Sequence, residues 1–489
     1  MTQENTKGKN FMKYIPVIGL EIHVQLLTKS KMFCSCQNKF GMEPNSLICP
    51  VCLGLPGSLP VLNKKALEYT IKTGFAVGCS IAEVSKMDRK NYFYPDLPKA
   101  YQISQYDQPV CGKGFIDITV NGVGKRIGIT RIHMEEDAGK LIHEETGDKS
   151  LVDYNRVGVP LMEIVSEPDM RTPEEAHEYL KEIKAILEYL EVSDCNMQEG
   201  SLRCDANVSI MPEGAEKFGT KAEIKNMNSF KGVQKAVEYE IKRQIELVEK
   251  GEKVVQETRL WDAVREVTVS MRSKEEAHDY RYFPEPDIMT IYLRDEAFKK
   301  SIKDSLPELP KEKLKRFMEQ HGLPAYDAGV LTAEKELAKY FEEAVNLYNN
   351  PKAISNWIMG DLLKELNNAG LSITNNKLSV QDLVSLIKAV EDGVVNRQTG
   401  KTVFEEMFRT GKKPDAIIEE KGLKQMNDAS EFESIINEII EKNPKALEEY
   451  KQGKEKAVGF FVGQVMYKTK GKANPKIVNQ LVLDMLKKR

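Results

Sequence analysis

A carboxylate and an imidazole stand two residues apart near the start of the chain, at Glu21 and His23 in the segment GLEIH. Successive side chains of a β-strand point to opposite faces, so the two share one face if this segment is a strand. Two further acidic segments interrupt β-prone, apolar sequence: HMEED at 133–137 and MEIVSE at 162–167. Carboxylates in such surroundings are usually paired or metal-bound, and oxygen-rich sites favour Mg²⁺ and, with it, nucleotide phosphates.

The residues alone leave two interpretations of these carboxylates open. Taken singly, each is more often a surface charge on an edge strand than a metal ligand. A shared metal site requires the three segments to meet in the fold, and spacing along the chain does not determine whether they do.

A second group of segments mixes cations, tyrosines and amides, with DRKNYFYPD at 88–96 and KAYQISQ at 99–105. Tyrosines that stack on bases and cations that hold phosphates suit a single-stranded nucleic-acid end. A tyrosine-rich loop packed on the domain surface fits the same residues equally well.

A third polar set lies farther along the chain. Strand alternation would align two rows of its side chains: Arg203, Asp205 and Asn207, and separately Lys221, Glu223 and Lys225. Rows of this kind form structural salt bridges as often as they form phosphate sites.

Four of the eight cysteines lie close together, in a C-x-C pair followed by C-P-V-C: Cys34, Cys36, Cys49 and Cys52. Thiols stay reduced in the cytosol, so this spacing predicts a tetrahedral zinc site rather than two disulfides. A catalytic zinc normally keeps one position open for water, so four cysteines indicate a structural metal. The other four cysteines read as small buried hydrophobes.

The elements that must position these residues fall into three predicted domains. A chain of 489 residues exceeds the size of one hydrophobic core. From 14 to 295 short β-prone runs alternate with turns, including a hairpin at 116–132 around Asn121-Gly122, and two helices are predicted at 173–190 and 231–250. An antiparallel α+β domain is therefore expected over 1–295.

Helical periodicity begins after LPELP at 306–310, and a capping-box start at Ser379 precedes another helix. A second break at GKKP, 411–414, is followed by short helices at 431–441, 444–450, 454–468 and 475–487. An all-α domain is expected over 296–410 and a small all-α tail domain over 411–489.

The tail is basic although the whole chain has a formal net charge of -3. Residues 451–489 hold ten Lys and Arg against two acidic residues, which leaves +8. Such a segment attracts a polyanion with salt-dependent affinity, and a solvated lysine-rich helix face is an equally good interpretation. The first thirteen residues lack the apolar region of a secretory signal, and no apolar run approaches the ~18 residues of a membrane span, so a soluble, cytoplasmic protein is expected.

One common means of binding ATP is missing from the sequence. No G-x-x-x-x-G-K-[ST] occurs, and GVGKR at 122–126 is too short and lies in the hairpin turn, so any ATP must be held by a site other than a P-loop.

Several segments together resemble the B subunits of the aspartyl/glutamyl-tRNA amidotransferases, and the likeness covers essentially the whole chain. They include GLEIHVQL, KMFCSC, DRKNYFYPDLPKAYQISQYDQP, RIHMEEDAGK, PLMEIVSEPD, EGSLRCDAN, KNMNSF, DYRYFPEPD, LPAYDAGVLT, SNWIMGDL and KAVGFFVGQVM. The resemblance implies a cradle-shaped catalytic domain followed by a helical domain and a tail domain. It also implies ATP-dependent phosphorylation of the side-chain carboxylate of Glu-tRNA(Gln), Asp-tRNA(Asn) or both, and its amidation with ammonia.

In that family the ammonia comes from glutamine hydrolysed by an A subunit, and a C subunit completes a heterotrimer. No glycine- and serine-rich amidase stretch occurs here, so that half-reaction is expected on the partner chain. ATP and Mg²⁺ are the implied cofactors, with zinc in a structural role.

The resemblance also assigns residues by motif. It places the Mg²⁺ on Glu21, His23, Glu136 and Glu163, with Glu135 as a weaker candidate. Contacts to ATP and the tRNA acceptor end fall on Arg89, Lys90, Arg203, Asp205 and Lys225. The basic tail fits binding to the tRNA body, with candidate phosphate contacts at Lys468, Lys470 and Lys472.

A rival from another class is a non-catalytic, zinc-containing scaffold that binds tRNA through its basic surface. In that case the carboxylates would be structural. Changing Glu21 or His23 separates the two hypotheses, since only the enzyme loses ATP-dependent activation while it keeps tRNA binding.

Overall fold

The computed structural model describes residues 13–143, 149–273, 280–425, 429–451, 456–469 and 473–488. The chain divides into two compact units, Met1–Pro310 and Lys311–Arg489, which are treated separately. Among the described residues, no helix combines the length and the apolar character that crossing a membrane requires.

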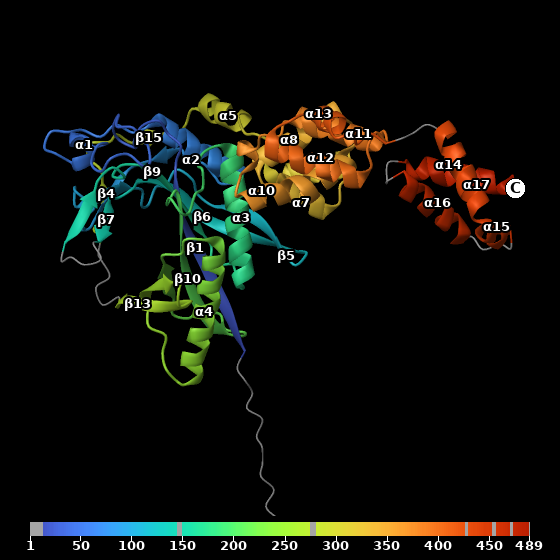
Figure 1. Cartoon of the computed structure of the whole chain (residues 1–489). Coiled ribbons are helices and arrows are strands. Elements are labelled where there is room, and N and C mark those ends of the chain that lie inside the picture. The colour runs from blue at the N-terminus through green and yellow to red at the C-terminus, as the bar shows by residue number, and fades with distance from the viewer. Residues whose placement is uncertain are drawn as a thin grey trace, which may run out of the picture. The chain divides into compact units, whose positions relative to one another are not determined.

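An eight-stranded sheet forms the centre of the first unit (Figure 1), in the order β13-β12-β11-β10-β1-β9-β6-β5. Neighbouring strands are antiparallel except β11 and β12, which are parallel. The strands are β1 (Tyr14–Gln25), β5 (Gly114–Val120), β6 (Val123–Glu136), β9 (Pro160–Ser166), β10 (Leu202–Pro212), β11 (Ala222–Lys225), β12 (Glu257–Asp262) and β13 (Val267–Ser273). The predicted α+β class is confirmed.

Helices α3 (Pro173–Leu190) and α4 (Phe230–Glu249) pack together and against strands β5 and β10. Thr172 and Ser229 cap their first turns, since each hydroxyl accepts a backbone N–H three residues ahead. Both helices end within one residue of the sequence prediction, and a third helix, α2 (Lys64–Ala76), packs against β6.

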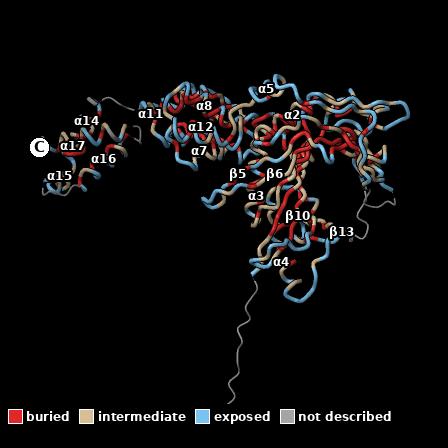
Figure 2. Tube along the Cα trace, turned by 180° about the vertical axis from the view of Figure 1, so that it is seen from behind, coloured by how far each residue is buried: buried red, intermediate tan, exposed pale blue. Residues whose placement is uncertain are grey.

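Alternate residues of β1 point to opposite faces of the sheet, one of which packs in the hydrophobic core. Ile18, Leu20, Ile22 and Val24 are buried in the same hydrophobic core as α3 and α4, and buried positions are concentrated along the central strands in Figure 2. Because side chains alternate across a strand, the opposite face of the sheet carries the polar residues between them.

The predicted hairpin joins β5 to β6, with Val120 opposite Val123. Both turn residues have positive φ, 52° at Asn121 and 80° at Gly122. This is the type I′ geometry for which Asn-Gly is favoured.

Smaller strand groups surround the open face of the sheet. β3 (Asp88–Asn91) lies between β4 (Tyr101–Ser104) and β14 (Phe283–Pro284). Two pairs complete the unit, β2 (Val84–Ser85) with β15 (Ile291–Tyr292) and β7 (Lys140–His143) with β8 (Ser150–Asp153). The short helix α1 (Pro50–Leu53) carries Cys52, and α5 (Glu296–Asp304) contributes Ile302 to the first core.

The second unit contains helices around two hydrophobic cores. The larger of these two cores is built by α6 (Pro310–His321), α7 (Ala325–Thr332), α8 (Lys335–Leu347), α9 (Pro351–Trp357), a π-helical turn (Ile358–Leu362), α10 (Leu363–Ala369), a 3₁₀ turn (Ile373–Asn375), α11 (Val380–Glu391), α12 (Arg397–Thr410) and α13 (Pro414–Glu420). The smaller core is built by α14 (Ala429–Lys442), α15 (Pro444–Lys451), α16 (Lys456–Lys468) and α17 (Pro475–Lys487).

The Ser379 cap is confirmed, because its hydroxyl accepts the backbone N–H of Asp382 at 3.1 Å. The four short helices of the tail also lie where they were predicted. Ile417 and Ile418 pack with the core of the preceding helices. The domain limits drawn at 295 and 410 stay a prediction.

Candidate active site

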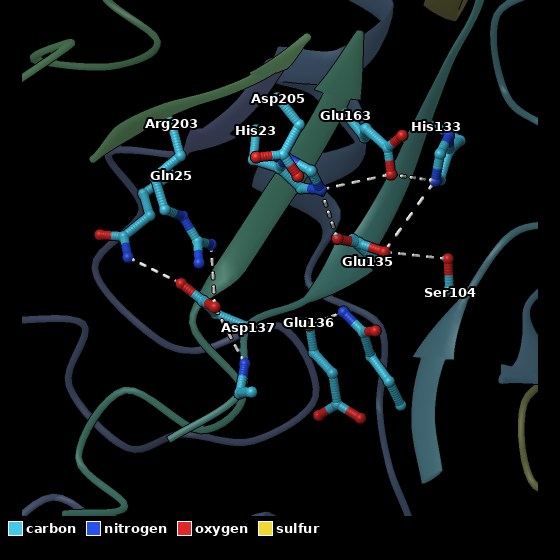
Figure 3. Close-up of polar contacts among 12 residues, drawn as sticks. His23, Gln25, Ser104, His133, Glu135, Glu136, Asp137, Glu163, Arg203 and Asp205 are labelled. Carbon is cyan, nitrogen blue, oxygen red and sulfur yellow. Dashed lines mark hydrogen bonds and ion pairs between the residues drawn. The ribbon is translucent and has the colours of Figure 1, made fainter. Parts of the chain in front are cut away.

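Four adjacent strands place one residue each in a single row across the open face of the sheet. His133 on β6 lies opposite Glu163 on β9, Glu163 lies opposite His23 on β1, and His23 lies opposite Arg203 on β10. The Glu163 Oε2 is 3.2 Å from the Nε2 of His133 and 3.5 Å from that of His23 (Figure 3). The three acidic and imidazole-bearing segments of the sequence therefore meet.

Glu135 completes a cluster with these residues. Its Oε1 lies 3.7 Å from the His23 Nε2, and its Oε2 accepts a hydrogen bond from the Ser104 hydroxyl at 3.2 Å. One ligand atom from each of His23, Glu135 and Glu163 lies within 4.8 Å of the other two. Two carboxylates and one imidazole fit a divalent cation that prefers oxygen.

The electrostatic surroundings keep Glu163 ionised. Burial would raise the pKa of Glu163, but the nearby charges of His133, His23 and Lys90 outweigh it and hold that pKa well below its usual range. Burial would likewise lower the pKa of Lys90, whereas the charge of Glu135 raises it. The site thus joins an ionised Glu163 to a retained ammonium on Lys90.

The structure does not bring Glu136 to this cluster, although the resemblance placed a metal ligand there. Its carboxylate points away from His23 and Glu163 (Figure 3) and forms a buried ion pair with Lys99. The Oε1 of Glu136 also accepts the Ile103 backbone N–H at 2.9 Å. The reason is the alternation of β6, which sends adjacent side chains to opposite faces, so Glu135 occupies the position expected for Glu136.

Glu21 lies on the same face as His23, two residues earlier along β1. Its Oε1 accepts a hydrogen bond from the Asn207 Nδ2 at 2.9 Å. Glu21 and Asn207 line a cavity of about 320 Å³, whose walls also include Phe218 and Lys221. Glu21 therefore connects the carboxylate cluster to a neighbouring cavity.

Asp205 and Lys225 pair with each other, at 2.6 Å between Oδ2 and Nζ. Burial would lower the pKa of Lys225, but the charges of Asp205 and Glu223 raise it above its usual value. Asp205 lies opposite Glu21 in the β1–β10 register, so this pair borders the cavity side of the cluster.

Arg203 is held by Asp137, a residue that sequence reasoning did not select. Its Nη2 donates to Asp137 Oδ1 at 2.9 Å, and Gln25 Nε2 donates to Oδ2 at 2.9 Å (Figure 3). Burial would raise the pKa of Asp137, but the charges of Arg203 and Arg156 hold it below its usual range. The Nε of Arg203 is buried and has no hydrogen-bond partner among the described residues.

Arg89 and Lys90, adjacent on β3, have different surroundings. Arg89 forms a two-point ion pair with Glu285, at 2.6 and 2.8 Å, and its guanidinium lies 4.3 Å from the centre of the Tyr101 ring. These contacts hold β14 against β3 and occupy most of the guanidinium. Lys90, in contrast, lies 4.9 Å from the centre of the Tyr280 ring, on the side of the carboxylate cluster.

The tyrosines that line this part of the site come partly from a distant segment. Tyr280 packs edge-on against Tyr92, and Tyr282 stacks on Tyr106 with ring centres 4.4 Å apart. The sequence analysis did not identify Tyr280 and Tyr282 as site residues. The only signal was the alternating aromatic and charged pattern of DYRYFPEPD.

The four cysteines converge as predicted. The Cys52 Sγ lies 3.5 Å from that of Cys34, 3.6 Å from that of Cys49 and 3.9 Å from that of Cys36. Zinc–sulfur bonds of about 2.3 Å place the corners of a regular tetrahedron about 3.8 Å apart. The donor set and its spacing therefore fit one zinc ion.

Lys31 is the fifth residue of this cluster and is 1% exposed. Its Nζ donates to the Leu47 carbonyl at 2.7 Å and to the Cys52 Sγ at 3.7 Å. The hydrogen bond from Cys34 is the largest influence that lowers the pKa of the Cys52 thiol, to about 5, and the charge of Lys31 acts in the same direction against the effect of burial.

Of the candidate phosphate contacts in the tail, Lys468 is the one that lies within the described residues, and it forms an ion pair with Glu438. Lys470 and Lys472 lie outside the described residues. A cavity of about 660 Å³ in this domain is lined by Lys442, Lys445, Lys456 and the exposed ring of Phe460.

Comparison with known proteins gives matches over most of the chain. Residues 16–299 match the family model described as "GatB/GatE catalytic domain", and residues 339–486 match the one described as "GatB domain". The chain is similar to proteins named as the B subunits of aspartyl/glutamyl-tRNA(Asn/Gln) amidotransferases. The one from Thermoanaerobacter pseudethanolicus is 60% identical over 477 residues, 98% of this chain and 100% of the relative.

Two further relatives with the same name agree. The protein from Carboxydothermus hydrogenoformans is 58% identical over 479 residues, 97% of this chain and 99% of the relative. That from Geotalea daltonii is 56% identical over 478 residues, 97% of this chain and 100% of the relative. The likeness thus extends through both compact units.

Proposed function

This chain belongs to the GatB/GatE family, and from that membership and its site we propose that it is the B subunit of an aspartyl/glutamyl-tRNA amidotransferase. It activates the side-chain carboxylate of Glu-tRNA(Gln), Asp-tRNA(Asn) or both with ATP, so that ammonia converts the acid to the amide. The observation that supports this most is the cluster of His23, Glu135 and Glu163 beside Lys90.

The residues divide the work by charge. His23, Glu135 and Glu163 would hold a Mg²⁺ ion, which supplies positive charge to phosphate oxygens. Lys90 faces the same cluster and binds the anionic groups that meet there. Because phosphoryl transfer depends mainly on positioning and charge stabilisation, this arrangement suits the activation step.

The reaction has two steps. A carboxylate oxygen of the aminoacyl group bonds to the γ-phosphorus, and the bond to ADP breaks. The nitrogen of ammonia then bonds to the acyl carbon, and phosphate leaves. The rings of Tyr92 and Tyr280 flank Lys90, and Tyr282 packs against Tyr280. We propose that these rings limit the access of water, which would hydrolyse the acyl phosphate.

The cavity beside Glu21 is the proposed nucleotide site. Phe218 is 56% exposed there and offers a ring face for a base, and Lys221 offers a cation for phosphates. Gly19 lines the same cavity and lets the ligand approach the backbone. Glu21 then lies between the nucleotide and the cation-binding cluster.

Ammonia is proposed to come from a partner glutaminase, the A subunit, in a heterotrimer completed by a C subunit. The relatives are each named as one lettered subunit of an amidotransferase, which supports an assembly of several chains. The tail domain is proposed to bind the tRNA body, where the lysines beside Phe460 combine phosphate contacts with an aromatic face.

The test is amide formation on aminoacyl-tRNA by the complete complex, with ammonium chloride as the nitrogen source. This donor bypasses glutamine hydrolysis. We expect His23→Ala to abolish ATP-dependent formation of the amide while tRNA affinity is kept. If the variant forms the amide at the native rate, the scaffold hypothesis replaces the enzyme hypothesis for this chain.

A further inference from the structure

The backbone of the cysteine-bearing segment lies directly on the side chain of Lys99. Gly54, which ends α1 two residues after Cys52, has a φ of +65°. A Cβ atom at this position would lie 2.5 Å from the Lys99 Cγ and 3.0 Å from its Cδ. Only glycine leaves room for the lysine stem at this point.

Lys99 extends from that contact to the end of β6. Its side chain is 5% exposed and its Nζ forms the buried ion pair with Glu136. The backbone carbonyl of Glu136 accepts a hydrogen bond from Gln102 Nε2 at 2.6 Å. Glu136 is the last residue of the strand and follows Glu135, so the ion pair and the Gln102 hydrogen bond both anchor the chain next to Glu135.

Gly158 lies between Lys31 of the cysteine cluster and the same Glu136 carboxylate. A Cβ on Gly158 would lie 3.6 Å from the Lys31 Cδ and 3.8 Å from the Glu136 Oε2, so the two side chains flank this glycine. The Gly158 carbonyl accepts a hydrogen bond from the Met32 backbone N–H at 2.7 Å, and the Gly158 N–H donates to the Asp137 carbonyl at 3.0 Å. The segment that carries the cysteines thus approaches Glu136 along two routes.

We propose that the cysteine cluster positions the active-site carboxylates, acting through Gly54, Lys99 and Glu136, in addition to folding its own segment. Gly54 and Lys99 are positioning residues in this scheme, because neither lies in the His23, Glu135 and Glu163 cluster. The inference rests on the proposed function and extends it: the contact of the cysteine-bearing segment with Lys99 sets the rate of carboxylate activation.

The chain offers a matched pair of variants for the test. Gly57 also has a positive φ, +83°, but nothing lies within 4 Å of the position of its Cβ. Gly54→Ala and Gly57→Ala therefore share the backbone strain of alanine in this region, and only the first displaces Lys99. The readouts are zinc content and tRNA-dependent ATP hydrolysis by the complete complex, separated into kcat and KM for ATP.

We expect both variants to retain one zinc per chain and an unchanged KM. A displaced carboxylate lowers kcat of Gly54→Ala about tenfold or more, whereas Gly57→Ala stays within about twofold of the native chain. Equal kcat values for the two variants would overturn the inference while leaving the proposed function intact. No tRNA-dependent hydrolysis by the native complex would instead refute the proposed function.

A double variant decides the case even if Gly54→Ala folds poorly or loses zinc. Lys99→Ala removes the Cγ and Cδ atoms that an alanine at 54 would meet. In the Lys99→Ala background, Gly54→Ala is expected to lower kcat no more than Gly57→Ala does, because Gly54 and Lys99 are coupled. A full, additive loss in the double variant would show that Gly54 acts without Lys99 and would contradict the inference.

Discussion

His23 and Glu163 face each other across the β1–β9 pair, with the imidazole Nε2 3.5 Å from the carboxylate Oε2. The relationship depends on strand register, because a shift of one residue would turn both side chains into the hydrophobic core. The same register places His133 and Arg203 at the two ends of the row. The chemistry of the site is therefore fixed by the pairing of four strands.

Zinc should be retained by the purified chain at one ion per molecule, because four thiolates at tetrahedral spacing bind it tightly. We expect Cys36→Ser to lose the metal and Cys195→Ser to keep it, since Cys195 is buried away from the cluster. Elemental analysis after exhaustive dialysis measures both. Equal zinc in the two variants would contradict the assignment.

The nucleotide cavity predicts a selective effect of Phe218→Ala. Loss of a stacking face costs about 1–3 kcal/mol, which raises the KM for ATP about fivefold or more and leaves tRNA affinity unchanged. Steady-state kinetics with varied ATP provides the measurement. Val264→Ala, at a residue 93% exposed, serves as the control, and an unaltered KM in Phe218→Ala would place the nucleotide elsewhere.

In the tail, Lys445 and Lys456 of the Phe460 cavity should contribute more to tRNA binding than Lys468, which is already paired. We expect Lys445→Ala and Lys456→Ala each to reduce the salt dependence of tRNA binding by about one unit of log–log slope. Lys468→Ala should have less effect, because Lys468 pairs with Glu438. Binding titrations at several salt concentrations test this ranking, and the reverse ranking would contradict it.

Glu342 on α8 should make the stability of the helical unit depend on pH. Burial would raise its pKa, but hydrogen bonds and charges from Lys313 and Arg316 on α6 hold it below the usual value. A lowered folded-state pKa contributes stability above the ordinary value of about 4.3 and loses it as pH falls through the folded-state pKa.

The expected cost of Glu342→Gln is about 1 kcal/mol at pH 7, because the carboxylate is partly exposed. The difference from the native chain should close as the pH falls below about 4. Denaturant unfolding at pH 7 and at low pH gives both values. A difference that is constant with pH would show that the ion pair is not its source.

Local signals in the sequence predicted the elements well. Asn121-Gly122 indicated the hairpin, and the 3.6-residue period around Tyr179 and Ile183 indicated α3. The cysteine spacing predicted a cluster that the fold assembles. Each of these depends on residues close together in the chain.

What the sequence could not provide depends on long-range register. Glu135 and Glu136 are adjacent residues of the same type. Only the face of the sheet to which each points places Glu135 in the cluster and Glu136 against Lys99. Tyr282 reaches Tyr106 because β14 joins β3 nearly 200 residues away in the chain, a pairing that no local pattern encodes. Arg203, a predicted contact to ATP and the acceptor end, pairs with Asp137, a partner that no local pattern identifies.

The most direct test of the proposed site compares Glu135→Gln with Glu136→Gln in tRNA-dependent ATP hydrolysis measured over a range of Mg²⁺ concentrations. We expect Glu135→Gln to raise the Mg²⁺ concentration for half-maximal rate about tenfold or more, because it removes a cluster oxygen. Glu136→Gln should raise that concentration by less, because it shifts the neighbouring Glu135 carboxylate without removing it, and should also lower the free energy of unfolding by about 3–5 kcal/mol, since it strands the buried Lys99. A raised Mg²⁺ requirement in Glu136→Gln alone would contradict the proposed site.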